Sequence, residues 1–156
     1  MKIRAMLLAV VAASFTLYAV SQTRVAPPYD LSHTVPVQVG KTILQGGDNI
    51  VIDAIHGSAD TISAGNVYRV DGHYKLASHD EANLSISITS AVDAHNDSHV
   101  PGRIESMMVD KGEGTFSLYF RMGSNGSAHL SFYPAKGGQR FASVYFNGTD
   151  AWAKAN

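Results

Sequence analysis

From Val35 onward, short runs of alternating apolar and polar residues are separated by turns rich in glycine, asparagine and aspartate. A period of two places successive side chains on opposite faces of a β-strand, and a helical period is almost absent. The alternation is cleanest at residues 84–89, whereas residues 35–44 and 50–55 are more apolar and suit strands covered on both faces. The sequence therefore predicts an all-β domain over residues 35–156.

The chain has 156 residues and no cysteine. Its length suits one domain, which buries roughly two-thirds of its unfolded surface and can hold a core without covalent staples. The lack of cysteine excludes disulfides, thiolate metal sites and cysteine nucleophiles.

The first 21 residues have the pattern of a secretory signal peptide. Lys2 and Arg4 form a cationic start, residues 5–20 are an apolar run, and residues 19–21 place small side chains at a cleavage site. The alternative is an uncleaved membrane anchor, but a spanning helix needs about 17–25 apolar residues, and this run has sixteen. We therefore expect the mature chain to begin near Gln22.

Residues 22–34 include Pro27-Pro28 and predict an extended leader. Removal of the signal peptide takes two of the twelve basic residues and none of the thirteen acidic ones, so the mature net charge is −3. A chain with no basic excess is a poor partner for nucleic acid. We expect an exported protein, periplasmic, cell-surface or extracellular, that meets a membrane only if its signal segment stays uncleaved.

Two interpretations compete for residues 68–76. Asp71-Gly72 is a hairpin signal, but a hairpin there would mix apolar and polar side chains on one face. A single strand instead puts every second residue from Tyr68 to Leu76 on the same side. Because a one-residue slip reverses every side chain, parity favours one long strand with a bend or bulge at Gly72.

The C-terminal half contains three polar, glycine-containing connections at residues 110–114, 123–127 and 135–139, followed by the turn signal Asn147-Gly148. Closing each as a hairpin predicts a five-strand antiparallel meander. The pairs it predicts include Met108–Phe116, Ile104–Phe120, Phe120–Leu130, Tyr119–Ser131, His129–Tyr145, Leu130–Val144 and Val144–Ala151.

Residues directly opposite each other share a face of a sheet. The meander therefore predicts a core face, and packing it on a second sheet from residues 35–89 gives an antiparallel β-sandwich, with a small closed barrel as the alternative. The predicted core residues are Ile104, Met108, Phe116, Leu118, Phe120, Leu130, Phe132, Val144 and Phe146.

The opposite face of the meander is predicted to be aromatic and open to solvent. Rings with hydroxyl or N–H groups can bind a glycan, a surface polymer or an envelope protein. The alternative is that the leader or a loop covers these rings and that they serve only packing. The candidate ligand-binding residues are Tyr119, His129, Tyr133, Tyr145 and Trp152.

The loop after residue 89 carries imidazole and carboxylate groups at alternating positions. Asp93, His95, Asp97 and His99 are suitable ligands for zinc or copper if the loop brings them together. No helix is predicted there to impose convergence, so a solvated loop remains the alternative.

No motif identifies an enzyme or a family. The chain lacks GxSxG and HExxH, and its glycine pairs precede no helix that could bind phosphate. His129 and Ser131 share a face of one strand, but no acid is placed to orient the histidine. The sequence thus favours a non-enzymatic binding module without a cofactor. A periplasmic metal-binding protein or a hydrolase with an unrecognised site remains the alternative.

Overall fold

The structure, a computed structural model, describes residues 29–89, 98–123 and 126–148. These residues form seven β-strands and no helix, so the all-β class is confirmed, and no helix among them is long and apolar enough to cross a membrane. The predicted signal peptide and the leader up to residue 28 lie outside the described residues. The strands are β1 (His33–Val35), β2 (Val39–Ile43), β3 (Asn49–Gly57), β4 (Val67–Thr89), β5 (Ser106–Arg121), β6 (Ser127–Pro134) and β7 (Ala142–Phe146).

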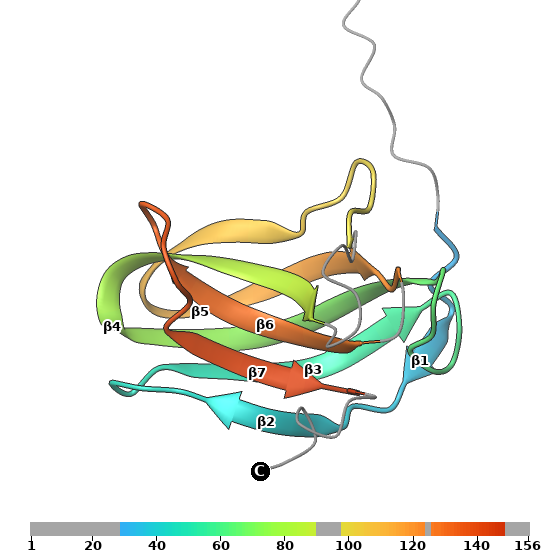
Figure 1. Cartoon of the computed structure of the whole chain (residues 1–156), viewed down its shortest axis with the longest axis horizontal. Helices are drawn as coiled ribbons and strands as arrows, with labels where there is room; N and C mark the ends of the chain where they lie inside the picture. The colour runs from blue at the N-terminus through green and yellow to red at the C-terminus, as the bar shows by residue number, and fades with distance from the viewer. Residues whose placement is uncertain (1–28, 90–97, 124–125, 149–156) are drawn as a thin grey trace, which may run out of the picture.

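The strands form one antiparallel sheet that curls into a half-barrel (Figure 1). Its order is β1-β3-β4-β6-β7-β2, and β5 pairs with the other edge of β4. The first half of β4 pairs with β3 and its second half with β6, while β5 follows β4 through both halves. Two separate sheets are not found because these two long strands run continuously through the curl.

The sheet turns at a large irregularity between β4 and β5. Leu76 pairs with Gly112 and Glu81 with Asp110, so four residues of β4 lie opposite the single residue Lys111. Extra residues on one strand of a pair increase its local bend and twist. The bend brings the two halves of β4 around a common interior (Figure 1).

The carboxylate of Asp48 holds the bend in β4. Asp48 is 6% exposed, and its Oδ1 accepts the backbone N–H groups of Ala77 at 2.8 Å and Ser78 at 2.9 Å. Its Oδ2 accepts the hydroxyl of Ser78 at 2.6 Å. Three polar groups of the bulge, which have no place in the sheet ladder, thus find their partner on the turn before β3.

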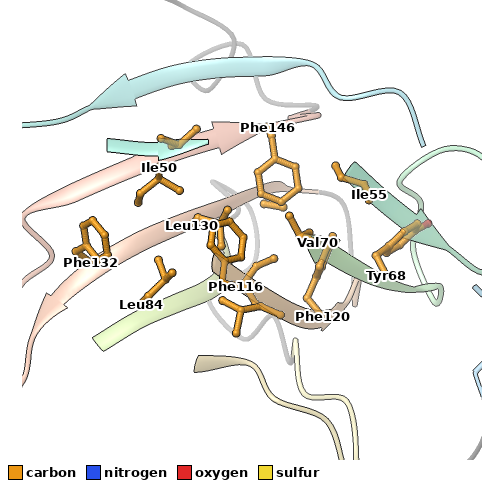
Figure 2. Packing of buried hydrophobic residues seen from close by; sticks show 14 of the residues in the cluster. Ile50, Ile55, Tyr68, Val70, Leu84, Phe116, Phe120, Leu130, Phe132 and Phe146 are labelled. Carbon is orange, nitrogen blue, oxygen red and sulfur yellow. The ribbon is translucent and has the colours of Figure 1, made fainter. Parts of the chain in front are cut away.

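The core lies inside the curl and draws on both halves of the sheet. Tyr68 and Phe120 stack at 5.2 Å, and Phe120 meets the edge of Phe146 at 6.0 Å. Figure 2 shows these rings beside Ile50 and Leu130 in one continuous cluster.

The single strand over residues 68–76 is confirmed. Gly72 lies within β4, and a Cβ on it would be 2.1 Å from the carbonyl oxygen of Val51 and 2.5 Å from the ring of Phe116. A register shift in β3 lies across from Gly72, between Ile52 and Ala54. Glycine is required here because β3 and the core ring approach the backbone too closely for any side chain.

The meander is only partly correct. The hairpin between β6 and β7 has the predicted register, with Leu130 opposite Val144. The two preceding hairpins are wrong, because residues 106–121 form one strand paired with β4, and β6 also pairs with β4. The polar residues 110–114 lie at the bulge of a continuous strand rather than in a turn, since β4 offers β5 an uninterrupted ladder.

Two residues of the predicted core are exposed, and the bulge explains the error at Met108. Seven of its nine residues are buried, but Ile104 is 60% and Met108 is 55% exposed. Between the first and second halves of β5 the parity slips by one, so Val109 is buried in place of Met108. A single extra residue reverses which side chains face inward.

The last predicted pairing fails for a different reason. β2 pairs with β7, with Thr42 opposite Val144, and Ala151 lies outside the described residues. β2 is also largely exposed rather than covered on both faces, with Val39 at 57% and Ile43 at 43%.

We predict that Asp48→Ala lowers the free energy of unfolding by about 3 kcal/mol, because it removes the buried charged acceptor of three hydrogen bonds from the β4 bend. The matched control is Asp53→Ala, which removes a side chain that is 54% exposed and should change stability by less than about 0.5 kcal/mol. Urea unfolding monitored by circular dichroism measures both values. Equal effects of the two substitutions would show that the bend does not depend on Asp48.

Candidate functional site

The outward side chains of β3, the first half of β4 and the second half of β5 form a polar array, here called the charged face. The same parity that turns Tyr68 and Val70 inward turns Arg69 and Asp71 outward. Successive rows across the three strands lie about 7 Å apart, because they are two residues apart along each strand. The charged face consists of Asn49, Asp53, His56, Arg69, Asp71, His73, Lys75, Glu113, Thr115, Ser117 and Tyr119.

Asp71 is the centre of a hydrogen-bonded cluster on this face. Its carboxylate accepts Arg69 Nε at 2.9 Å and the hydroxyl of Ser117 at 2.7 Å, and His56 Nε2 lies 4.0 Å away. Partial burial acts to lower the pKa of Arg69, but the hydrogen bond and charge of Asp71 outweigh it and raise that pKa above its usual value. Side chains from three adjacent strands are thereby held in fixed positions.

A second pair lies one row further along the charged face. The register shift in β3 leaves Asp53 without a partner in β4, and its Oδ2 lies 3.0 Å from His73 Nδ1. Both side chains are more than half exposed. Ion pairs of this kind contribute little to stability, so their polar groups remain available to a ligand.

A cleft opens at this end of the charged face. It has a volume of about 460 Å³ and is lined by Asn49, His73, Tyr74, Lys75, Glu113, Gly114 and Thr115. Tyr74 points inward by parity, and its ring packs over Gly114 and meets Phe132 edge-on at 6.1 Å. The cleft therefore brings together several hydrogen-bonding side chains from three strands.

Aromatic residues close the opposite end of the charged face. The guanidinium of Arg103 lies 5.3 Å from the ring centre of Tyr119 and 5.8 Å from that of Tyr29. These are cation–π distances, and they connect the start of the described chain to β5.

The structure separates the five aromatic-face residues that the sequence predicts. Tyr119 lies on the charged face, opposite Arg69 of β4 rather than Ser131, so that predicted pairing is wrong. His129 and Tyr145 are opposite each other as predicted, with ring centres 4.8 Å apart, but they are 2% and 1% exposed. Tyr133 is half-buried opposite Asn83, and Trp152 lies outside the described residues.

His129 belongs to a buried hydrogen-bonded chain. Its Nε2 lies 2.9 Å from the Thr89 hydroxyl and 3.4 Å from Arg140 Nη1. Because arginine can only donate, Nε2 accepts and the proton resides on Nδ1. Nδ1 then donates to Ser131 Oγ at 2.9 Å, and the Ser131 hydroxyl donates onward to Ser143 at 2.7 Å.

This direction of donation does not suit hydrolysis. A nucleophilic serine gives its proton to the histidine, whereas here His129 donates to Ser131. Ser131 is also fully buried. The Ser131–His129 pair therefore has a packing role, and the charged face is the better candidate site.

The predicted metal loop is described only at its end. Asp93, His95 and Asp97 lie outside the described residues. His99 Nδ1 lies 2.7 Å from Glu105 Oε1, a contact between the loop and the start of β5. Within the ranges that the structure describes, no three histidine or acidic side chains group in a way that could hold a metal ion.

The charged face was not among the sites predicted from the sequence, although the alternation in β4 indicates it. Arg69, Asp71, His73 and Lys75 alternate with the inward residues of β4, so the strand parity that placed the core also placed them outward. Asp53 and His56 could not be added from sequence, because the register shift in β3 changes which residues face outward.

Comparison with known proteins finds no matching family model, no matching curated protein and no matching solved structure. The function of this chain is therefore inferred from its own residues.

We predict that His129 makes the folded state sensitive to acid. Burial, and then the positive charge of Arg140, lower the pKa of His129 to about 4. In the unfolded chain a histidine titrates near 6.5, so the unfolded state takes up a proton that the folded state refuses. Stability should thus be complete above pH 6.5 and should fall between pH 6.5 and 4, by about 3 kcal/mol in total.

Urea unfolding at pH 7 and pH 4.5 measures this effect. His129→Gln should flatten the dependence, whereas His56→Gln, at a partly exposed position on the charged face, should leave it unchanged. A His129→Gln protein with the same loss of stability on acidification would show that other groups cause it.

Proposed function

We propose that this chain is an exported, non-enzymatic binding module that holds a glycan or another hydroxyl-rich surface polymer on its charged face. In this proposal residues 1–21 are a cleaved signal peptide and residues 22–34 a leader. The two halves of the curled sheet then act as the facing layers of the predicted sandwich.

The observation that carries the proposal is the combination of ordered polar side chains and a cleft on one exposed face. Asp71 and Asp53 hold their neighbours in place, so little side-chain entropy is lost when a ligand binds. Neighbouring donors and acceptors on one face of the sheet match the closely spaced hydroxyl groups of a sugar polymer.

Charge favours a polyhydroxylated ligand over nucleic acid. The charged face carries Asp53, Asp71 and Glu113 against Arg69 and Lys75, so it has no excess of positive charge. A phosphate backbone would meet three carboxylates and two cations among these residues, and the mature chain is acidic overall. Uncharged hydroxyl groups can donate hydrogen bonds to the carboxylates and accept them from the cationic side chains.

The proposal changes the roles of the predicted aromatic residues. Tyr119 remains a ligand-binding candidate because it lies on the charged face. His129 and Tyr145 are buried and serve packing. Loss of binding on substitution of Trp152 but not of His73 would favour the aromatic face of the sequence analysis instead.

We expect His73→Ala and Lys75→Ala each to weaken binding about 2- to 10-fold, the effect of removing one hydrogen bond. Affinity electrophoresis of residues 22–156 in gels containing neutral or acidic soluble polysaccharides measures this retardation. Lys41→Ala on the exposed β2 is the matched control, and all three variants should keep the melting temperature of the parent. The proposal is wrong if no polysaccharide retards the chain, or if the charged-face variants are retarded as strongly as the control.

A further inference from the structure

The outer edge of β5 offers a site for strand addition. Among the described residues β5 pairs only with β4, through the backbone groups of alternate residues. Tyr119 donates its N–H to the carbonyl of Ile104 at 2.8 Å, and Arg121 donates to Ser98 at 2.9 Å. Both N–H groups therefore point away from β4. Since the register is regular from residue 112 to 121, the backbone groups of Glu113, Thr115 and Ser117 also point outward.

These three residues form an open window in the second half of the β5 edge. The segment 98–104 covers β5 at Tyr119 and Arg121, and the bulge at Lys111 ends the regular edge on the other side. The side chains of Glu113, Thr115 and Ser117 are exposed, and their outward backbone groups have no partner in the part of the chain described by the structure.

The two ends of the sheet order do not offer a comparable site. β2 has an irregular register around Lys41, and β1 is only three residues long. Bulges, lysine and short length are the usual protection of an edge strand.

We propose that a second copy of this chain adds to the window in antiparallel orientation, with the two-fold axis at Thr115. Each copy then donates three backbone N–H groups and accepts three. In this register Thr115 lies opposite Thr115 of the second copy, a favourable β-branched pair, and Glu113 lies opposite Ser117. No like charges oppose each other, so the window is complementary to itself, as a two-fold interface must be.

Dimerisation extends the charged face without altering it. The β5 strands of the two copies become neighbours, and two charged faces join into one surface. A repetitive polymer that binds both copies gains affinity from the linkage. The dimer itself does not depend on the identity of any ligand, so it can be tested separately from the proposed function.

Sedimentation velocity of residues 22–156 over a range of concentrations tests for the dimer. Thr115→Pro removes the central outward N–H but no bond to β4, a position that proline tolerates at a sheet edge. It should weaken the dimer roughly 30-fold or more, because both copies lose a hydrogen bond at the axis. Thr115→Val keeps the N–H and the branched side chain, and it should keep the dimer.

A charge exchange tests the register even if the proline variant fails to fold. Ser117→Lys places lysine opposite Glu113 of the second copy twice, so it should tighten the dimer roughly 2- to 30-fold. Adding Glu113→Lys places lysine opposite lysine and should reverse that gain.

A chain that stays monomeric into the millimolar range overturns the proposal. So does a dimer whose dissociation constant is the same for the parent, Thr115→Pro and the lysine variants, since its interface must then lie elsewhere. An extended peptide of another protein that binds the window while the chain stays monomeric would identify a different occupant.

Discussion

The fold depends on one carboxylate at the inside of a bend. β4 is 23 residues long, and it can serve both halves of the sheet only if it turns sharply in the middle. Asp48 makes that turn possible by accepting two backbone N–H groups and one hydroxyl from the four extra residues. Without Asp48 these donors would lose their acceptor in the protein, and a flatter β4 could not bring Leu84 and Tyr68 into the same core.

The strand class and much of the register followed from sequence because parity is a local property. The alternation in residues 68–76 decided between a hairpin and a strand correctly, and the β6–β7 hairpin was placed in its true register. Both features depend on neighbours within one strand or across one short turn. Alternation predicts the wrong inward residues where a strand contains a bulge, as it does near Gly112. No apolar pattern in the sequence shows that a bulge lies between Val109 and Phe116.

The pairing of distant strands could not be predicted in this way. Glycine-containing segments at residues 110–114 and 123–127 have the composition of tight turns, and no local pattern favours β4 as the partner of β5. β5 pairs with β4 because β4 is long enough to form hydrogen bonds with it along both halves of the sheet. Part of the candidate site could not be predicted for the same reason, because Thr115 and Ser117 join the charged face only through the pairing of β5 with β4.

The two halves of the sheet present outer faces of opposite character, and this contrast assigns them different roles. In the second half a row of serines crosses four strands, Ser106, Ser85, Ser131 and Ser143. Burial along the row increases until Ser131 and Ser143 are fully buried and bond to each other. In the first half, the equivalent positions carry long charged side chains that are ordered by one another and half exposed. Small hydroxyl groups that hydrogen-bond to each other suit a covered surface, whereas ordered charges beside an open cleft suit recognition. The proposed binding role is therefore placed on the first half.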